Sequence, residues 1–194
     1  MRRACAVLAV ALLGAAPASP PGLPTTRIAG PYYVVETSSL RYNTDSGAFV
    51  ADAPVKVTKQ RLDAAGERAE GNVKAGTATL HGSVQVHDGG GPSSPRGKSA
   101  PPATLTCDQL EVDGKRELYH AEGRARYESG ERTATARTMI LDRKHKTLHL
   151  EGDVVMTQGD STARAQVVDM DLASGRTVST GAPVTLSRPA SPAP

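Results

Sequence analysis

The fold of this chain is decided by the stretch LHLEGDVVM, residues 148–156. Apolar side chains recur there at every second position on either side of Gly152, and most residues between them are polar. Alternation with a period of two is typical of a β-strand that has one buried and one solvated face. A glycine in the middle of such a strand permits a sharp bend. The stretch therefore predicts a bent strand of an antiparallel sheet.

The same pattern recurs along the chain with a period of 29 residues. Two markers keep this register, an Asn or Asp before the strand and a small residue at its centre, which indicates an internal repeat. The first marker stands at Asn43, Asn72, Asp113, Asp142 and Asp171, and the second at Ala53, Gly82, Gly123, Gly152 and Gly181. Between the second and third units the spacing grows by 12 residues, which fall in the Gly/Pro/Ser-rich segment 88–103. We expect that segment to be an inserted surface loop.

Each unit is expected to contain two strands joined by a tight turn. The earlier strand ends at sequences such as Asp113-Gly114-Lys115 and Ala173-Ser174-Gly175, which suit hairpins. About five such 29-residue repeats predict an all-β fold, an elongated β-jelly-roll or sandwich of antiparallel strands. A parallel β-solenoid could have the same period, but it would stack residue i on residue i+29. In the fifth unit Ser179, Pro183 and Thr185 replace apolar residues, as expected of a polar end cap.

The N-terminus has the pattern of an export signal. Arg2 and Arg3 precede an apolar run over residues 4–15, and Ala16-Pro17-Ala18 forms a small-residue cleavage site. The apolar run is shorter than the roughly 20 residues that span a bilayer, which disfavours a membrane anchor. The predicted division of the chain is a signal peptide over 1–18, a disordered lead-in over 19–31, one β-domain over 32–186 and a disordered tail over 187–194.

Composition and residue types argue against several functional classes. Loss of the signal lowers the formal net charge from +3 to +1, and a chain with one Phe and no Trp offers little to nucleic acid. Nucleophile motifs and inward carboxylate pairs are absent, so we predict no enzyme and no catalytic residue. His145 and His149 have no third ligand nearby, so no metal and no cofactor are predicted. Cys107 lies in a predicted strand, where we expect an inert apolar residue.

The inward apolar positions allow two interpretations. They could fill a core, as in a structural β-repeat scaffold, or they could line a groove. The scarcity of large aromatic side chains and the small residue at the centre of every unit favour a groove. Basic turns at Lys115-Arg116 and at residues 143–146 could contact an anionic lipid headgroup or could simply keep the protein soluble.

Residues 148–160, LHLEGDVVMTQGD, resemble the repeated signature apolar-x-apolar-x-G-N-V-x-apolar-x-Q-G of the LptA/OstA proteins. Residues 136–142, ARTMILD, resemble the strand that precedes this signature, and residues 40–43 and 82–84 match more loosely. The resemblance extends over about Tyr33 to Leu186. The chain departs from the pattern at the central motif of its first and last units and at the insertion described above.

The resemblance implies a periplasmic lipopolysaccharide carrier, a β-jelly-roll whose two sheets part along an open seam to hold the acyl chains of lipid A. Leaving a twelve-carbon chain in water would cost about 10 kcal/mol at about 0.8 kcal/mol per methylene, so a carrier must cover it. The candidate lining residues are Leu110, Val112, Tyr127, Met139, Leu141, Leu148, Leu150, Val154, Met156, Val168 and Met170.

The resemblance also implies partners. Jelly-rolls of this family join head to tail through open edge strands into a bridge, here a possible homo-oligomer that would use residues 36–42 and 178–186. An LptC-like inner-membrane protein and an LptD-like outer-membrane protein would lie at its ends. Two alternatives are an LptC-like accessory protein and a structural β-repeat scaffold with a filled core.

Overall fold

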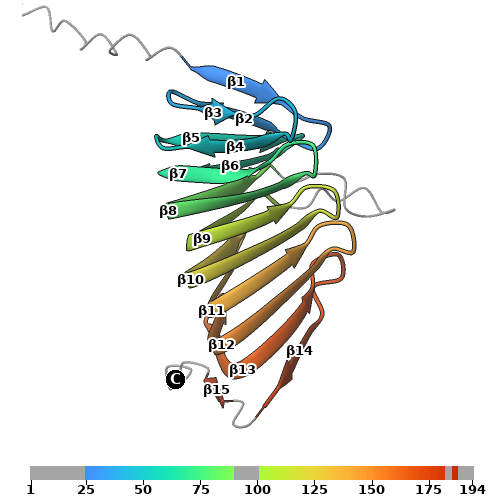
Figure 1. Cartoon of the computed structure of the whole chain (residues 1–194). Coiled ribbons are helices and arrows are strands. Elements are labelled where there is room, and N and C mark those ends of the chain that lie inside the picture. Colours follow the sequence, from blue (N-terminus) through green and yellow to red (C-terminus); the bar gives the residue numbers. More distant parts are fainter. Residues whose placement is uncertain (1–24, 90–100, 182–184, 188–194) are drawn as a thin grey trace, which may run out of the picture.

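The computed structural model describes residues 25–89, 101–181 and 185–187, which form one antiparallel sheet of fifteen strands. The strands are β1 (Thr26–Ala29), β2 (Val34–Thr37), β3 (Arg41–Tyr42), β4 (Ala48–Ala51), β5 (Val55–Lys59), β6 (Leu62–Gly66), β7 (Arg68–Asn72), β8 (Thr77–Asp88), β9 (Ala103–Asp113), β10 (Leu118–Ser129), β11 (Arg132–Asp142), β12 (Thr147–Gln158), β13 (Ser161–Asp171), β14 (Thr177–Thr180) and β15 (Thr185–Ser187). They stack one after another along the long axis of the molecule (Figure 1). No helix capable of crossing a bilayer occurs in the described residues.

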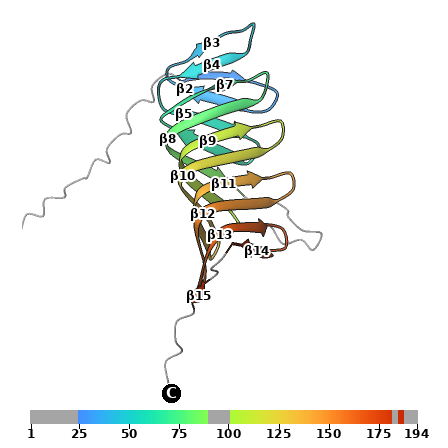
Figure 2. The same cartoon turned by 60° about the horizontal axis from the view of Figure 1, so that its bottom comes forward.

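The sheet folds over on itself into two facing walls. The first half of β8 pairs with β7 and its second half pairs with β6, so a single long strand contributes to both walls. Nearer the N-terminus the walls are built from separate short strands, with β3, β4 and β7 in one and β1, β2, β5 and β6 in the other. Figure 2 shows the strands curving from one wall into the other. This elongated jelly-roll confirms the predicted fold class.

The bend in β8, β10 and β12 is a β-bulge at the repeated glycine. Gly82, Gly123 and Gly152 have φ angles of +75°, +75° and +83°, and the residue after each of them also has a positive φ. The pairing register shifts at the same places. Bulges of this kind bend and twist a strand sharply, and positive φ favours glycine. The central glycine predicted from the sequence is therefore the corner between the walls.

The other marker of each unit, the repeated Asn or Asp, closes the turn that follows it. Its side-chain oxygen accepts hydrogen bonds from backbone N–H groups two or three residues further on, in an Asx turn. At Asp171 the donors are Ala173 and Ser174, at 2.8 and 2.9 Å. Equivalent bonds occur at Asn43, Asn72, Asp113 and Asp142. The 29-residue period therefore reflects the same kind of Asx turn at five places in the described residues.

The core lies between the walls and contains the inward positions that the alternation predicts. In the first four units the apolar residues two and four positions from the central small residue are buried, apart from Met156, which is partly buried. In the fifth unit all four residues of β14 are exposed, as expected of a polar end. The strands pair across their turns, for example Leu141 with Leu148, so the solenoid alternative is wrong.

The structure corrects two sequence predictions at the N-terminal end. The lead-in over 19–31 was expected to be disordered, but Thr26–Ala29 form β1 and pair with Val34–Thr37. Ile28 packs against the core, and the pairing satisfies backbone groups that β2 would otherwise leave open. The open edge expected over 36–42 is present at β3 (Arg41–Tyr42) in one wall, but β2 is paired on both sides, so in the other wall the edge lies at β1.

Several predicted boundaries fall outside the described residues. These are the signal peptide over 1–18, residues 19–24 of the lead-in, most of the inserted loop over 88–103, and residues 188–194 of the tail. The two ends of that loop are described, and Asp88 and Ala103 are paired residues of β8 and β9.

We predict that Gly152→Ala destabilises the protein more than Gly159→Ala. Both glycines have positive φ, which costs an alanine about 1–2 kcal/mol. A Cβ atom at Gly152 would in addition lie 2.8 Å from Cβ of Arg137, whereas one at Gly159 would meet nothing within 4 Å. Urea unfolding should show a loss of about 1 kcal/mol for Gly159→Ala and about 2–3 kcal/mol for Gly152→Ala. Equal losses would mean that the corner needs only the backbone freedom of glycine.

We also predict a pH-dependent effect of Asp171→Ala. Hydrogen bonds from the Ser174 and Ala173 backbone hold the pKa of Asp171 below its usual value. Such a carboxyl adds stability above its unfolded-state pKa and loses it as the pH falls through the lower folded-state pKa. The thermal midpoint of Asp171→Ala, followed by circular dichroism, should therefore lie below wild type at pH 7, and the difference should shrink below about pH 4.

Asp171→Asn is the matched control, because Asn43 and Asn72 hold the same turn in other units. Its midpoint at pH 7 should stay close to wild type. A deficit of Asp171→Ala that is unchanged between pH 7 and pH 2 would show that the carboxylate charge does not contribute to the turn.

Candidate functional site

The open side of the folded sheet lies opposite the glycine corners. A strand that is bent at its middle brings both of its ends to this side, so the hairpin connections form two facing rims. The Asx rim consists of the connections at 43–47, 73–76, 114–117, 143–146 and 172–176. The loop rim contains the connections at 60–61, 130–131 and 159–160, together with the paired ends of β8 and β9. The space between the two rims is the seam.

A lysine crosses the seam in the N-terminal half. Nζ of Lys59, on the loop rim, donates to the carbonyl oxygen of Gly114 at 2.5 Å and pairs with the Glu117 carboxylate at 2.9 Å. We call these contacts the lysine clasp. Beside it, the Tyr33 hydroxyl donates to the carbonyl oxygens of Thr77 and Asn72 at 2.5 and 3.2 Å. Together these contacts close the seam in this half of the molecule.

An arginine crosses the seam further along. Nε and Nη2 of Arg143, on the Asx rim, donate to the two carboxylate oxygens of Asp88 at 2.9 and 3.2 Å. The two side chains are only 18% and 22% exposed, so this bidentate pair is better shielded from solvent than the surface ion pairs elsewhere. We call this pair the arginine latch. It joins residues that are 55 positions apart in the sequence.

A buried hydroxyl lies near the latch. The Tyr119 side chain is 1% exposed, and its hydroxyl has no hydrogen-bond partner among the described residues. Burial raises the pKa of Tyr119 to about 12, and the guanidinium of Arg143 acts in the opposite direction.

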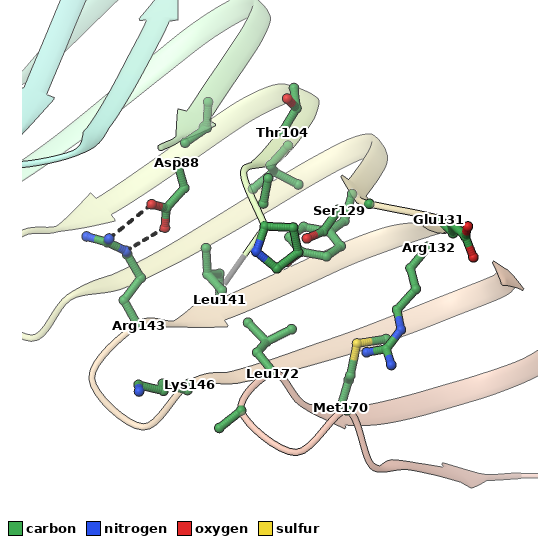
Figure 3. Close-up of a pocket in the computed structure, with 18 of the residues that line it drawn as sticks. Asp88, Thr104, Ser129, Glu131, Arg132, Leu141, Arg143, Lys146, Met170 and Leu172 are labelled. Atoms are coloured by element: carbon green, nitrogen blue, oxygen red, sulfur yellow. Dashed lines mark hydrogen bonds and ion pairs between the residues drawn. The ribbon is translucent and has the colours of Figure 1, made fainter. Parts of the chain in front are cut away.

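Past the latch, the seam opens into a groove of about 710 Å³, within the range of about 300–1,000 Å³ of ligand pockets. Apolar side chains from successive strands make its floor, and charged side chains stand on its rims (Figure 3). The apolar residues include Val86, Leu105, Tyr127, Leu141, Met170 and Leu172. The charged residues are Arg61, Asp88, Glu131, Arg132, Arg143 and Lys146. The apolar floor suits the tail of an anionic amphiphile, and the mainly cationic rims suit its headgroup.

Arg132 lies over the far part of this groove. It begins β11 on the loop rim, and Figure 3 shows its side chain directed toward Met170. Its guanidinium also approaches the opposite rim, because a Cβ atom added at Gly175 would lie 2.6 Å from Nη2 of Arg132. The groove is therefore bordered by Arg143 from the Asx rim and by Arg61 and Arg132 from the loop rim.

The structure divides the eleven candidate lining residues into two groups. All of them face the interior, and all are buried except Met156, which is partly buried. Tyr127, Leu141 and Met170 line the groove. Seven of the others pack in the buried core between the walls, and Met156 packs against that core while partly exposed. The filled-core interpretation therefore describes the deep interior, and the groove interpretation describes the seam in the C-terminal half.

Sequence reasoning missed most of the seam. Asp88 and Arg132 were not candidates, although Arg143 and Lys146 were considered as headgroup contacts. The repeat contains a signal for Arg143. Arg143 directly follows the turn Asp, and in two other units this position holds the buried Val73 and Leu172, which packs against the core. A charged residue at an inward repeat position is the anomaly that could have revealed the latch.

The histidines and the cysteine do not form a reactive centre. His145 and His149 contact Asp142 and Asp169, each at 2.7 Å, and the described residues contain no cluster of three metal-binding side chains. Cys107 is buried, and burial raises the pKa of its thiol to about 12. Its thiol is therefore protonated at neutral pH, and thiolate is the reactive form.

Two sequence families match separate parts of the chain. Residues 26–88 match the family described as lipopolysaccharide-assembly, LptC-related, and residues 102–176 match the family described as LptA/(LptD N-terminal domain) LPS transport protein. Neither description names an enzymatic activity. No curated protein sequence matches the chain significantly.

Among solved structures, the chain is similar to LptH of Pseudomonas aeruginosa, described as the LptA homologous periplasmic component of the conserved lipopolysaccharide transport device. The TM-score is 0.55, with 17% sequence identity, over 66% of this chain and 94% of that one. At 17% identity the structural similarity establishes a shared fold only. The similarity in sequence rests on the two family matches. Two separate parts of the chain are therefore similar to families of lipopolysaccharide assembly and transport proteins, and the chain shares its fold with an LptA homologue.

Proposed function

We propose that this chain is a periplasmic bridge protein that shields the lipid A acyl chains of lipopolysaccharide on their way from the inner to the outer membrane. The observation that carries the proposal is the seam, where two walls with apolar inner faces leave a groove of about 710 Å³ open to one side. A lateral opening lets a tail slide in while its sugar and phosphate headgroup stays in water.

The energetics favour such a site. Each methylene moved from water to the apolar floor contributes about 0.8 kcal/mol, so a tail of ten or more carbons outweighs the loss of a few polar contacts at the rim. The groove accepts the first part of a tail against Tyr127, Leu141 and Met170. The seven buried candidates outside the groove would contact a tail only as the walls separate, and their apolar side chains would then exchange contacts with each other for contacts with the tail.

The ends of the sheet suit assembly into a bridge. β1 and β3 are open edges at one end, and β14 pairs only with β13 at the other end, where Val178 is 44% exposed. Open edges present unpaired backbone groups that can add a strand from another chain. We propose that copies join head to tail there, with an LptC-like protein at the inner membrane and an LptD-like protein at the outer membrane. A signal peptide over residues 1–18 would direct the export and would be cleaved from the mature protein.

A bridge is favoured over an LptC-like accessory role by the position of the groove. The LptC-related match ends at Asp88, whereas most of the groove residues lie within the LptA/LptD match over 102–176. The apolar tail site is therefore built mainly from the part of the chain that is similar to transport proteins.

We predict that a diazirine side chain at position 141 captures lipopolysaccharide and that the same group at position 140 does not. Leu141 points into the groove, whereas its neighbour Ile140 is 36% exposed on the outer face of the same strand. The measurement is photo-crosslinking in cells that export the full chain, followed by detection of lipopolysaccharide on the purified protein. Labelling at 140 that equals or exceeds labelling at 141 would contradict transport through the interior.

A further inference from the structure

The lysine clasp and the arginine latch occupy equivalent positions in successive repeats. Each residue of the latch region lies 29 positions after its counterpart in the clasp region, and the charges are reversed. The counterparts are Lys59 and Asp88, Gly114 and Arg143, and Glu117 and Lys146. The seam therefore has one bridging position per repeat, filled by a cation from the loop rim in one unit and by a cation from the Asx rim in the next.

In the following repeat the same positions cannot form an ion pair. Ser129 stands on the loop rim, and Leu172 and Gly175 stand on the Asx rim. All three line the groove. The arginine latch is thus the last bridge before the seam opens, and it borders the mouth of the groove.

The two cations of the Asx rim stand at positions that suit other residues. Arg143 replaces the inward Val73 and Leu172 of other repeats. Lys146 has a φ of +58°, and its counterpart Glu117 a φ of +62°, at a position where Gly47, Gly76 and Gly175 provide the conformational freedom in other repeats. A backbone conformation that disfavours a side chain persists where surrounding contacts enforce it and is frequent at binding sites. These two cations stand together at the one place where the closed part of the seam meets the open part.

We propose that Arg143 and Lys146 form a binding site for the anionic headgroup of an amphiphile, and that the arginine latch opens when this headgroup replaces the Asp88 carboxylate on Arg143. The inference rests on the proposed function and assigns the headgroup end of that site. Figure 3 shows Leu141, Leu172 and Met170 between the latch and Arg132, so a tail that continues from Arg143 meets an apolar surface at once.

Replacing the Asp88 carboxylate by a headgroup changes the contacts of the Arg143 guanidinium little. Burial of the tail therefore determines whether the replacement is favourable. A carboxylate or phosphate headgroup makes the same charge-assisted bidentate contact with Arg143 that Asp88 makes. Asp88 has the advantage of being attached to the same chain, which gives it a high effective concentration. A free anion has nothing to offset this advantage, whereas an amphiphile gains the burial of its tail. The site is therefore selective for an anion that has a tail.

The test uses calorimetric titration of the full chain with two probes of equal tail length, dodecyl phosphate and dodecyl maltoside, both at monomeric concentrations. Wild type should bind dodecyl phosphate about ten-fold more tightly than dodecyl maltoside, the typical effect of one charge-assisted bidentate contact. Asp88→Asn should bind both probes more tightly, because the latch is open. Arg143→Gln should bind the maltoside more tightly as well, but should lose the preference for phosphate.

The two variants differ in the preference for phosphate, which Asp88→Asn keeps and Arg143→Gln loses, and this difference separates the proposal from a structural role. Arg137→Gln and Asp153→Asn break an exposed ion pair of 2.7 Å on the outer face and should leave both affinities unchanged. Arg143→Lys keeps the charge without the bidentate geometry and should retain part of the preference. A thermal midpoint near that of wild type for each variant shows that it is folded.

Three outcomes would overturn the inference. The first is a phosphate preference that survives Arg143→Gln, and the second is an identical response of Asp88→Asn and Arg143→Gln with both probes. The third is equal competition by inorganic phosphate, which would mean that a free anion is the ligand. If neither probe binds to wild type or to Asp88→Asn, the groove itself does not hold tails, and the proposed function fails with it.

Discussion

The structure depends on one constraint, the glycine bulge that bends every second long strand, β8, β10 and β12. A straight strand of 11 or 12 residues would build a flat sheet with two solvated faces and no interior. Positive φ at Gly82, Gly123 and Gly152 turns the strand through the corner, so that both halves direct their alternating apolar side chains to the same side. The same bend brings both strand ends to the open side and thereby creates the seam.

Two kinds of interaction then act on different parts of the molecule. Hydrophobic contact between the walls is collective and holds the deep interior, where residues such as Leu110, Met139 and Leu148 are fully buried. The seam is held by single polar contacts, the lysine clasp and the arginine latch, each of which joins only a few atoms. Because the polar contacts are few, the seam is the part of the fold where the least must be broken for the walls to separate.

Much of the fold could be predicted from the sequence because its rules are local. The period of 29 residues follows from the Asx turns, and the inward positions follow from alternation within a strand. β1 escaped prediction because its pairing with β2 depends on a partner rather than on its own pattern. The candidate lining residues were correctly placed on the inward face, but alternation alone does not distinguish the mouth of the groove, as at Leu141, from the sealed core, as at Leu150.

The sequence by itself determined the strands, their turns, their corner glycines and their buried face, since each of these depends on residues only a few positions apart. The tertiary structure alone decided which rim residues meet across the seam. Asp88 and Arg143 are 55 positions apart, and their contact requires the corners of several strands to bring both rims together. The tertiary structure also decided where the seam stays open. The seam closes only where side chains on the two rims have opposite charges and are long enough to meet.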